Sequence, residues 1–273
     1  MRPFKELYFR LTHATPERKA SRSNLRKARN GDAEAFLALA AHYFDLALIY
    51  LGTCREEAVA ARTSRIETLF TSLWRKIAYA ERVSDFEFML ERALSENAPE
   101  DSLLDSPEAL VGGLRSLNAQ SRFALIAHDL ENWPLRWVAL LMRMRPMALH
   151  QLLSETRCAL CSIDWQSLAK EERSCLVDVS ISMASCPNPR ANKALYRRIL
   201  NFPRVIEIKS LWLELRPDLV EVRYRYLLEP DQREQMLRNL FSHIQASPRD
   251  EAPLIDRVVN SVHFSRHGKI KVS

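Results

Sequence analysis

Cysteine is the residue type that first suggests chemistry in this chain of 273 residues. Cys158 and Cys161 form a Cys-x-x-Cys pair, and Cys175 and Cys186 follow it. A structural zinc site usually needs a second Cys-x-x-Cys or a His-x-x-x-His pair, and the chain has neither. The five cysteines are an odd number, and the pair lies among apolar residues of a helical segment. We therefore expect reduced core thiols, without a metal site or a disulfide framework.

Histidine and glycine give no sign of catalysis. Three of the seven histidines cluster late, at His243, His263 and His267, but none is spaced from a carboxylate as a proton-transfer pair would be. Nucleophile elbows and phosphate-cradling loops need glycines, and the chain has only five. We therefore expect no enzyme, no catalytic residues and no cofactor.

Basic residues are concentrated at the start of the chain. The first thirty residues hold nine Lys or Arg against two acids, whereas the whole chain has a net charge of +6. A basic segment beside a folded body is a common device for binding phosphates, because each neutralised phosphate releases counterions. A solvated helix face or a transit peptide has a similar composition. We treat residues 1–29 as a basic N-terminal arm.

Two prolines mark a pair of short helices in the middle of the chain. Pro134 and Pro146 each stand where a first helical turn begins, a position that needs no N–H donor. Only Arg143-Met144-Arg145 separates the segments 134–142 and 146–160. So short a connection predicts a helix-turn-helix, whose second helix can enter a major groove.

The first third of the chain reads as a helical bundle, residues 30–96. One helix follows Asp32, carries apolar residues at three- and four-residue spacing and is expected to end at Gly52. A second covers about 56–79, and a third starts near Ser84 or Asp85. Residues 97–106 are polar and acidic, which predicts a linker. The helix-turn-helix domain then covers 107–161, with further helices at about 107–117 and 119–130.

The C-terminal extension, residues 162–273, is harder to interpret. Helical patterns cover 164–184 and 188–200, and an amphipathic helix begins at Pro230-Asp231. The segments 205–215 and 219–228 alternate in a way that fits strands as well as helices. We therefore expect a mainly α fold, with a short β element as the alternative in the extension.

No stretch approaches eighteen uninterrupted apolar residues, and the N-terminus lacks the apolar core of a secretory signal. These features predict a cytoplasmic protein that does not use a membrane.

Two stretches resemble the two domains of ECF-type sigma factors, the specificity subunits of bacterial RNA polymerase. The first runs from Asn30-Gly31-Asp32-Ala33-Glu34-Ala35-Phe36 to Leu51-Gly52 and on through Ile66-Glu67-Thr68-Leu69-Phe70-Thr71-Ser72-Leu73-Trp74 to residue 94. The second runs from Leu114-Arg115-Ser116-Leu117-Asn118 through His128-Asp129-Leu130-Glu131-Asn132-Trp133 to Arg157. The chain departs from the family pattern at Ser64 and Arg65, in place of acids, and at Arg143, in place of the glycine of the turn.

The resemblance implies partners and site residues. Polymerase core would bind the helix around Glu67, Phe70 and Trp74. The base-facing positions of the second domain would be Met147, His150 and Gln151, with Arg157 toward the backbone and Arg143 and Arg145 on phosphates. Gln151 has the chemistry to bond an adenine edge and His150 to donate to a guanine. Promoter DNA and a regulatory protein such as an anti-sigma factor are further implied partners.

Three functions therefore stay open. The first is a transcription initiation factor that resembles ECF sigma factors, with the C-terminal extension in an unknown role. The second is a degenerate sigma-like adaptor that acts through protein contacts. The third is a stand-alone helix-turn-helix DNA-binding regulator. The alternative to base reading is that Leu149, Leu152 and Leu153 pack the domain while His150 and Gln151 are only solvated. Base reading also fails if His150 and Gln151 lie inside a packed interior.

Overall fold

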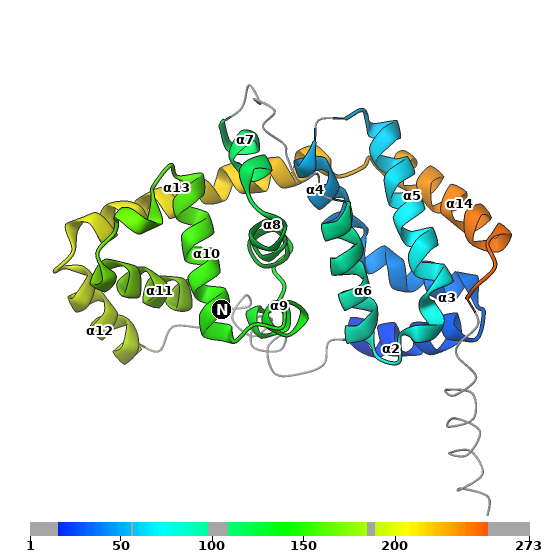
Figure 1. The fold of residues 1–273 in the computed structure, drawn as a ribbon, viewed down its shortest axis with the longest axis horizontal. Coiled ribbons are helices and arrows are strands. Elements are labelled where there is room, and N and C mark those ends of the chain that lie inside the picture. Colours follow the sequence, from blue (N-terminus) through cyan, green and yellow to red (C-terminus); the bar gives the residue numbers. More distant parts are fainter. Residues whose placement is uncertain (1–15, 56, 98–108, 185–188, 251–273) are drawn as a thin grey trace, which may run out of the picture.

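The computed structural model describes residues 16–55, 57–97, 109–184 and 189–250, and within these ranges every regular element is helical. The mainly α class predicted from the sequence is confirmed. The helices form an elongated body, with α12 near one end and α14 near the other (Figure 1).

The N-terminal helices end and begin at recognisable local signals. The Asp32 carboxylate caps α3 by accepting from the backbone N–H of Ala35 at 2.9 Å. Gly31, just before it, has a φ of 105°, which glycine adopts freely. The expected long helix is interrupted by a 3-10 turn, so that the elements are α2 (Pro16–Arg29), α3 (Ala33–Ala40), η1 (Ala41–Tyr43), α4 (Phe44–Cys54), α5 (Val59–Arg75), η2 (Ile77–Tyr79) and α6 (Val83–Glu96).

Residues 16–29 are part of the folded body, which corrects the expectation of an arm over that range. They form α2, whose Leu25 and Ala28 are buried against α3. The first fifteen residues of the expected arm lie outside the described residues. Basic side chains therefore follow one helix whose other face belongs to the core.

The middle of the chain contains the expected pair of short helices. Helix α8 continues into a π-helical turn, and α9 and α10 follow it with four residues between them. The bounds are α7 (Ala109–Ser116), α8 (Ala119–Leu125), η3 (Ile126–Leu130), α9 (Leu135–Leu141) and α10 (Pro146–Leu160).

The C-terminal extension contains no strand in its described part, so the β alternative is wrong there. The two alternating segments form a single helix, α13, which passes through Pro217. Its buried residues recur at three- and four-residue spacing, from Val205 to Tyr226, and this helical period accounts for the pattern. The elements are η4 (Trp165–Ser167), α11 (Lys170–Ala184), α12 (Pro189–Ile199), α13 (Pro203–Tyr226) and α14 (Pro230–Ala246).

One continuous core joins the two domains expected at 30–96 and 107–161. It includes Phe36 and Phe70 from the first domain and Phe123 and Leu149 from the second. A smaller core forms around Trp165, Cys175 and Trp212. The predicted boundary near residue 97 therefore does not separate independent cores; the rest of the expected linker, 98–106, lies outside the described residues.

The last two helices form a strap across the body, which we call the C-terminal strap (α13 and α14, Pro203–Ala246). The first half of α13 contributes Trp212 to the smaller core, and its second half contributes Leu219 and Tyr226 to the larger one. Helix α14 then packs on α3 and α5 (Figure 1). The strap therefore connects the two cores through a single helix.

Among the residues that the structure describes, one stretch, Ala33–Cys54, is long and apolar enough to cross a membrane by length and composition. Most of this stretch is buried by neighbouring helices, as in the central helix of a globular core.

Gly52 provides a test of how closely the strap is seated. The expected helix end at Gly52 is wrong, because α4 runs on to Cys54. The residue instead leaves room for the ring of Tyr226, since a Cβ on Gly52 would lie 2.3 Å from Cδ1 of that ring. We predict that Gly52→Ala lowers the free energy of unfolding by about 1 to 3 kcal/mol in urea titrations.

The control is the same substitution in a Tyr226→Ala background, where the ring is absent. There Gly52→Ala should cost much less, and an equal cost in both backgrounds would show that the close contact is not the cause.

Candidate nucleic-acid interface

The turn between α9 and α10 has the tight geometry expected of a helix-turn-helix. Arg143 takes the left-handed backbone conformation, with a φ of 52°, at the place where the resemblance implies a glycine. A non-glycine residue pays roughly 1 to 3 kcal/mol for this conformation. Its guanidinium lies 4.3 Å from the ring centre of Phe88 on α6, a cation–π contact that offsets part of the cost. The Arg143 side chain therefore helps to stabilise the turn through its contact with Phe88.

Three of the expected DNA-binding residues are exposed at the start of α10. Arg145 precedes the helix, and Met147 and Gln151 lie one turn apart on the same face. The Met147 side chain is 56% exposed, which is unusual for a large apolar residue. These residues form a small accessible edge with one cation, one thioether and one amide.

His150 does not face solvent, so the expected base contact is not met in this arrangement. Its ring is buried between α10 and α11, where Nδ1 lies 3.2 Å from the hydroxyl oxygen of Ser180. Burial, together with the positive charges of His128 and Arg157, lowers the pKa of His150 to about 4. The ring is therefore neutral near pH 7.

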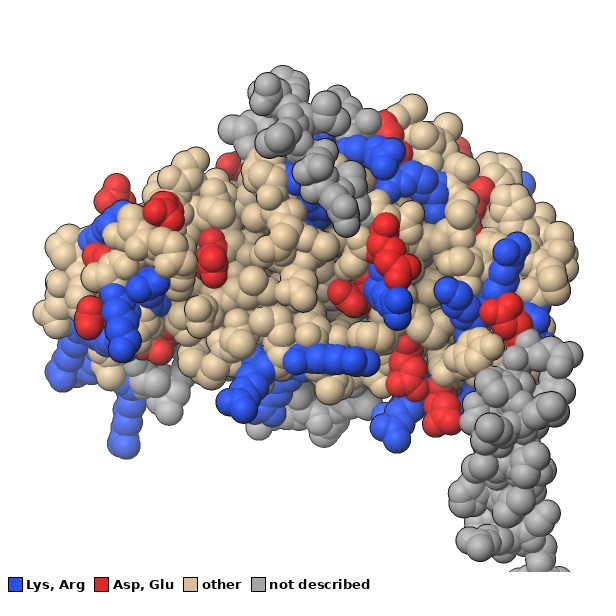
Figure 2. Space-filling view, in the orientation of Figure 1, with Lys and Arg blue, Asp and Glu red and all other residues tan. Residues whose placement is uncertain are grey.

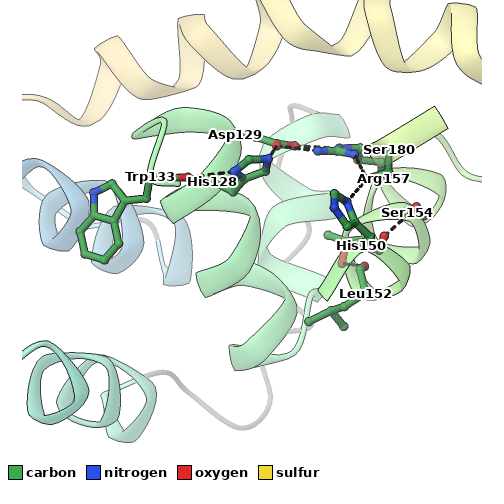
Figure 3. Close-up of polar contacts among 9 residues, drawn as sticks. His128, Asp129, Trp133, His150, Leu152, Ser154, Arg157 and Ser180 are labelled. Carbon is green, nitrogen blue, oxygen red and sulfur yellow. Dashed lines mark hydrogen bonds and ion pairs between the residues drawn. The ribbon is translucent and has the colours of Figure 1, made fainter. Parts of the chain in front are cut away.

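Arg157 is likewise buried, and its place is set by an ion pair instead of a phosphate. Its guanidinium donates to both carboxylate oxygens of Asp129, at 2.6 and 2.8 Å, and to the hydroxyl of Ser180 at 3.0 Å. It also lies 5.5 Å from the ring centre of Trp212. Figure 3 shows His128, Asp129, Arg157, Ser180 and His150 arranged as a chain of polar contacts. A fork-to-fork pair of this kind is among the strongest polar contacts in proteins.

The electrostatics of Asp129 follow from this contact. Burial alone would raise the pKa of the Asp129 carboxyl, but the charge and hydrogen bonds of Arg157 outweigh it and hold that pKa below its usual value. Asp129 lies in the π-helical turn after α8, and the sequence pattern gave no signal that it would meet Arg157, 28 residues later.

Of the residues expected to bind polymerase, Glu67 contacts α14, Trp74 contacts the residues that follow α14, and Phe70 lies inside the core. Phe70 is fully buried, and the Glu67 carboxylate accepts from the amide of Asn239 at 3.1 Å. The Trp74 indole N–H donates to the carbonyl of Ser247 at 3.3 Å, and Arg249 lies over its ring. The face of α5 implied by the resemblance is therefore in contact with the chain's own C-terminal strap and the residues that follow it.

A second basic feature lies between α2, α6 and α9; the sequence drew attention to the basic residues of α2 but not to the cavity that they line. A cavity of about 580 Å³ opens there, which we call the arginine cavity. Figure 2 shows Lys and Arg side chains recurring along the lower edge of the body, where α2, α9 and the start of α10 lie in Figure 1. The lining residues are Arg22, Leu25, Arg26, Arg29, Glu81, Arg82, Val83, Ser84, Trp137 and Leu140.

The cysteines with described positions are free thiols in or near the cores. Cys158 is fully buried, and burial raises its pKa to about 12. Among the described residues, no group of three or more His, Cys, Asp or Glu converges as metal ligands would. Cys186 lies outside the described residues.

Comparison of the chain with models of known protein families, with curated proteins and with solved structures gives no significant match. The resemblance to ECF-type sigma factors therefore stays a prediction from the sequence.

The buried state of His150 predicts a pH-dependent contribution to stability. Its pKa is about 4 in the folded chain and about 6.5 when unfolded, so only the unfolded chain takes up this proton between those values. The free energy of unfolding should fall by about 3 kcal/mol from this residue as the pH drops from 6.5 to 4.

The measurement is urea unfolding at several pH values, with His150→Gln as the matched variant. The difference between the two proteins should shrink or reverse steadily as the pH falls through that window. A difference that does not change with pH would mean that the His150 ring is solvated in the folded chain.

The ion pair of Asp129 predicts a second effect. Asp129→Asn leaves a buried guanidinium without its carboxylate, so we expect a loss of about 3 to 5 kcal/mol in the free energy of unfolding. The double variant Asp129→Asn/Arg157→Met removes the uncompensated charge and should recover much of the loss. If the double variant is as unstable as the sum of the single ones, the two side chains do not act as a pair.

Proposed function

We propose that the protein is a cytoplasmic DNA-binding regulator that contacts duplex DNA through the α9–α10 turn and the first turns of α10. The observation that carries this proposal is the exposed edge of Arg145, Met147 and Gln151 on α10. This helix follows a short turn in which Arg143 takes the left-handed backbone conformation. In helix-turn-helix proteins, the N-terminal residues of the second helix contact the base edges in the major groove, and this edge lies at the same end of α10.

The chemistry of the edge divides into positioning and reading. Arg145, with Arg143 at the turn, has the charge to hold phosphates, which sets the orientation of the helix on the duplex. Gln151 has the donor and acceptor needed to bond an adenine edge, and Met147 offers an apolar contact for a thymine methyl group. His150 and Arg157 hold α10 in place from behind. With one polar base-reading residue, we expect modest sequence preference and strong salt dependence.

Transcription initiation with bacterial RNA polymerase and promoter DNA is the more specific form of this proposal, and it rests on the sequence resemblance. In this structure, polymerase contact at Glu67 and Trp74 requires α14 and the following residues to move away from α5, whereas Phe70 is buried in the core. We therefore expect full initiation activity only when a further event, such as binding of a regulatory protein, displaces them.

An adaptor that acts through protein contacts is the second candidate, and one observation favours it. Helix α13 exposes apolar side chains at seven-residue spacing, Ile206, Leu213 and Val220, followed by Tyr224, which is 64% exposed. A stripe of this period on one helix face is typical of helix–helix contact with a partner.

Arg145→Ala tests the DNA proposal through its salt dependence. Losing one phosphate contact should weaken duplex binding on every sequence and reduce the slope of log affinity against log salt by about 1. Gln151→Ala should instead reduce the discrimination between sequences. Fluorescence anisotropy with random and selected duplexes measures both quantities.

The matched control is Arg238→Ala, which removes an exposed arginine from α14, away from this edge. The control should keep the wild-type slope. If the wild type, Arg145→Ala and Arg238→Ala all show the same slope of log affinity against log salt, the α9–α10 edge is not the DNA contact.

Pull-down with bacterial core polymerase, followed by run-off transcription, separates the more specific functions. Polymerase binding with promoter-specific transcripts supports an initiation factor. Polymerase binding without transcripts supports the adaptor, and duplex binding without polymerase supports a stand-alone regulator.

A further inference from the structure

We propose that the arginine cavity binds a free nucleotide that carries two or more phosphates. The phosphates lie on the arginines of α2 and α6, and the base lies against Trp137 and Leu140 of α9. This site is separate from the α9–α10 edge and does not depend on the function proposed for that edge.

The arginines of α2 are spaced for a shared anion. Arg22, Arg26 and Arg29 follow one another at four and three residues, which places them along one face of the helix. Within the described part of the chain, no hydrogen bond or ion pair engages these three guanidinium groups. Like charges one turn apart repel and destabilise a helix, so a bound polyanion relieves a cost that the fold otherwise bears.

The α6 side of the cavity adds to this positive charge. Arg82 lies at the start of α6, and Val83 and Ser84 of its first turn also line the cavity. The first-turn Asp85 carboxylate accepts from the backbone N–H of Arg82 at 2.8 Å, so the positive charge on this side comes from the Arg82 guanidinium. Glu81 is the one acidic residue in the lining, against four arginines. The balance favours a ligand with several negative charges over an isolated phosphate.

The remaining wall of the cavity is apolar, and this favours a ligand with an apolar or aromatic part beside its phosphates. Leu25 and Val83 are buried beneath the cavity, while Leu140 is 59% exposed at its rim. Trp137 lies in the same wall, and an indole ring offers a surface on which any base can stack. A cavity of about 580 Å³ is in the usual range for small-molecule sites. A charged end joined to a flat ring is the chemistry of a nucleotide.

Isothermal titration of the full chain with ATP and with GTP tests the proposal, with adenosine and tripolyphosphate as the two half-ligands. We expect saturable binding of at least one nucleotide. Arg26→Ala and Arg82→Ala should each weaken it about tenfold, the effect of one hydrogen bond to a charged group. Arg238→Ala, on α14, should leave it unchanged.

Trp137→Leu separates a nucleotide site from a simple anion site. The substitution should weaken nucleotide binding about tenfold, from the loss of base stacking, and leave tripolyphosphate binding unchanged. No binding of ATP or GTP would overturn the proposal. The proposal would also be overturned if tripolyphosphate bound as tightly as the nucleotides and Trp137→Leu had no effect on the affinity for nucleotides.

A single-stranded oligonucleotide without terminal phosphates distinguishes the two sources of a nucleotide. If the oligonucleotide binds through Arg26 and Trp137 and free nucleotides do not, the cavity takes a strand and the proposal fails. Arg145→Ala should leave nucleotide binding unchanged, so that failure at this cavity and failure of the DNA edge are observed separately.

Discussion

A guanidinium that has left water needs a carboxylate close by, and in this protein that need determines where α10 sits. Arg157 reaches Asp129 with two hydrogen bonds and Ser180 with a third, and Trp212 covers it. These partners come from the turn after α8, from α11 and from α13. Because an unpaired buried charge is costly, α10 has little freedom to rotate once these four elements meet.

This constraint divides the residues of α10 between the interior and the surface. The side that carries His150 and Arg157 is turned toward α11 and α13, so these two side chains hold the helix instead of reading a groove. The same orientation leaves Met147 and Gln151 in solvent. The Ser180 hydroxyl accepts from Arg157 and lies beside Nδ1 of His150, and a neutral ring suits this position.

The C-terminal strap extends the same kind of constraint to the other end of the body. Arg223 pairs with Glu131 at 2.8 Å and Arg233 with Asp45 at 2.6 Å, so successive cations tie the strap to elements about a hundred residues or more away. Tyr226 rests on Gly52, and α14 covers the α5 face that includes Glu67. The α9–α10 edge and the arginine cavity lie outside the contacts that the strap makes, and the strap exposes apolar side chains on the outer face of α13.

Local signals in the sequence were enough to predict the helical class, the Asp32 cap and the close pair α9 and α10, because capping, proline placement and apolar period act within a few residues. The resemblance to ECF-type sigma factors pointed to Arg145, Met147 and Gln151, and these residues lie on the exposed side. The sequence could not show that His150 and Arg157 face inward, since both faces of α10 carry polar residues and only the distant Asp129 and Ser180 decide between them. Nor could it show that Val205 to Tyr226 is one helix, because a short segment can fit both the two-residue period of a strand and the period of a helix. Packing against the two cores, which bury every third or fourth side chain of this segment, decides for the helix.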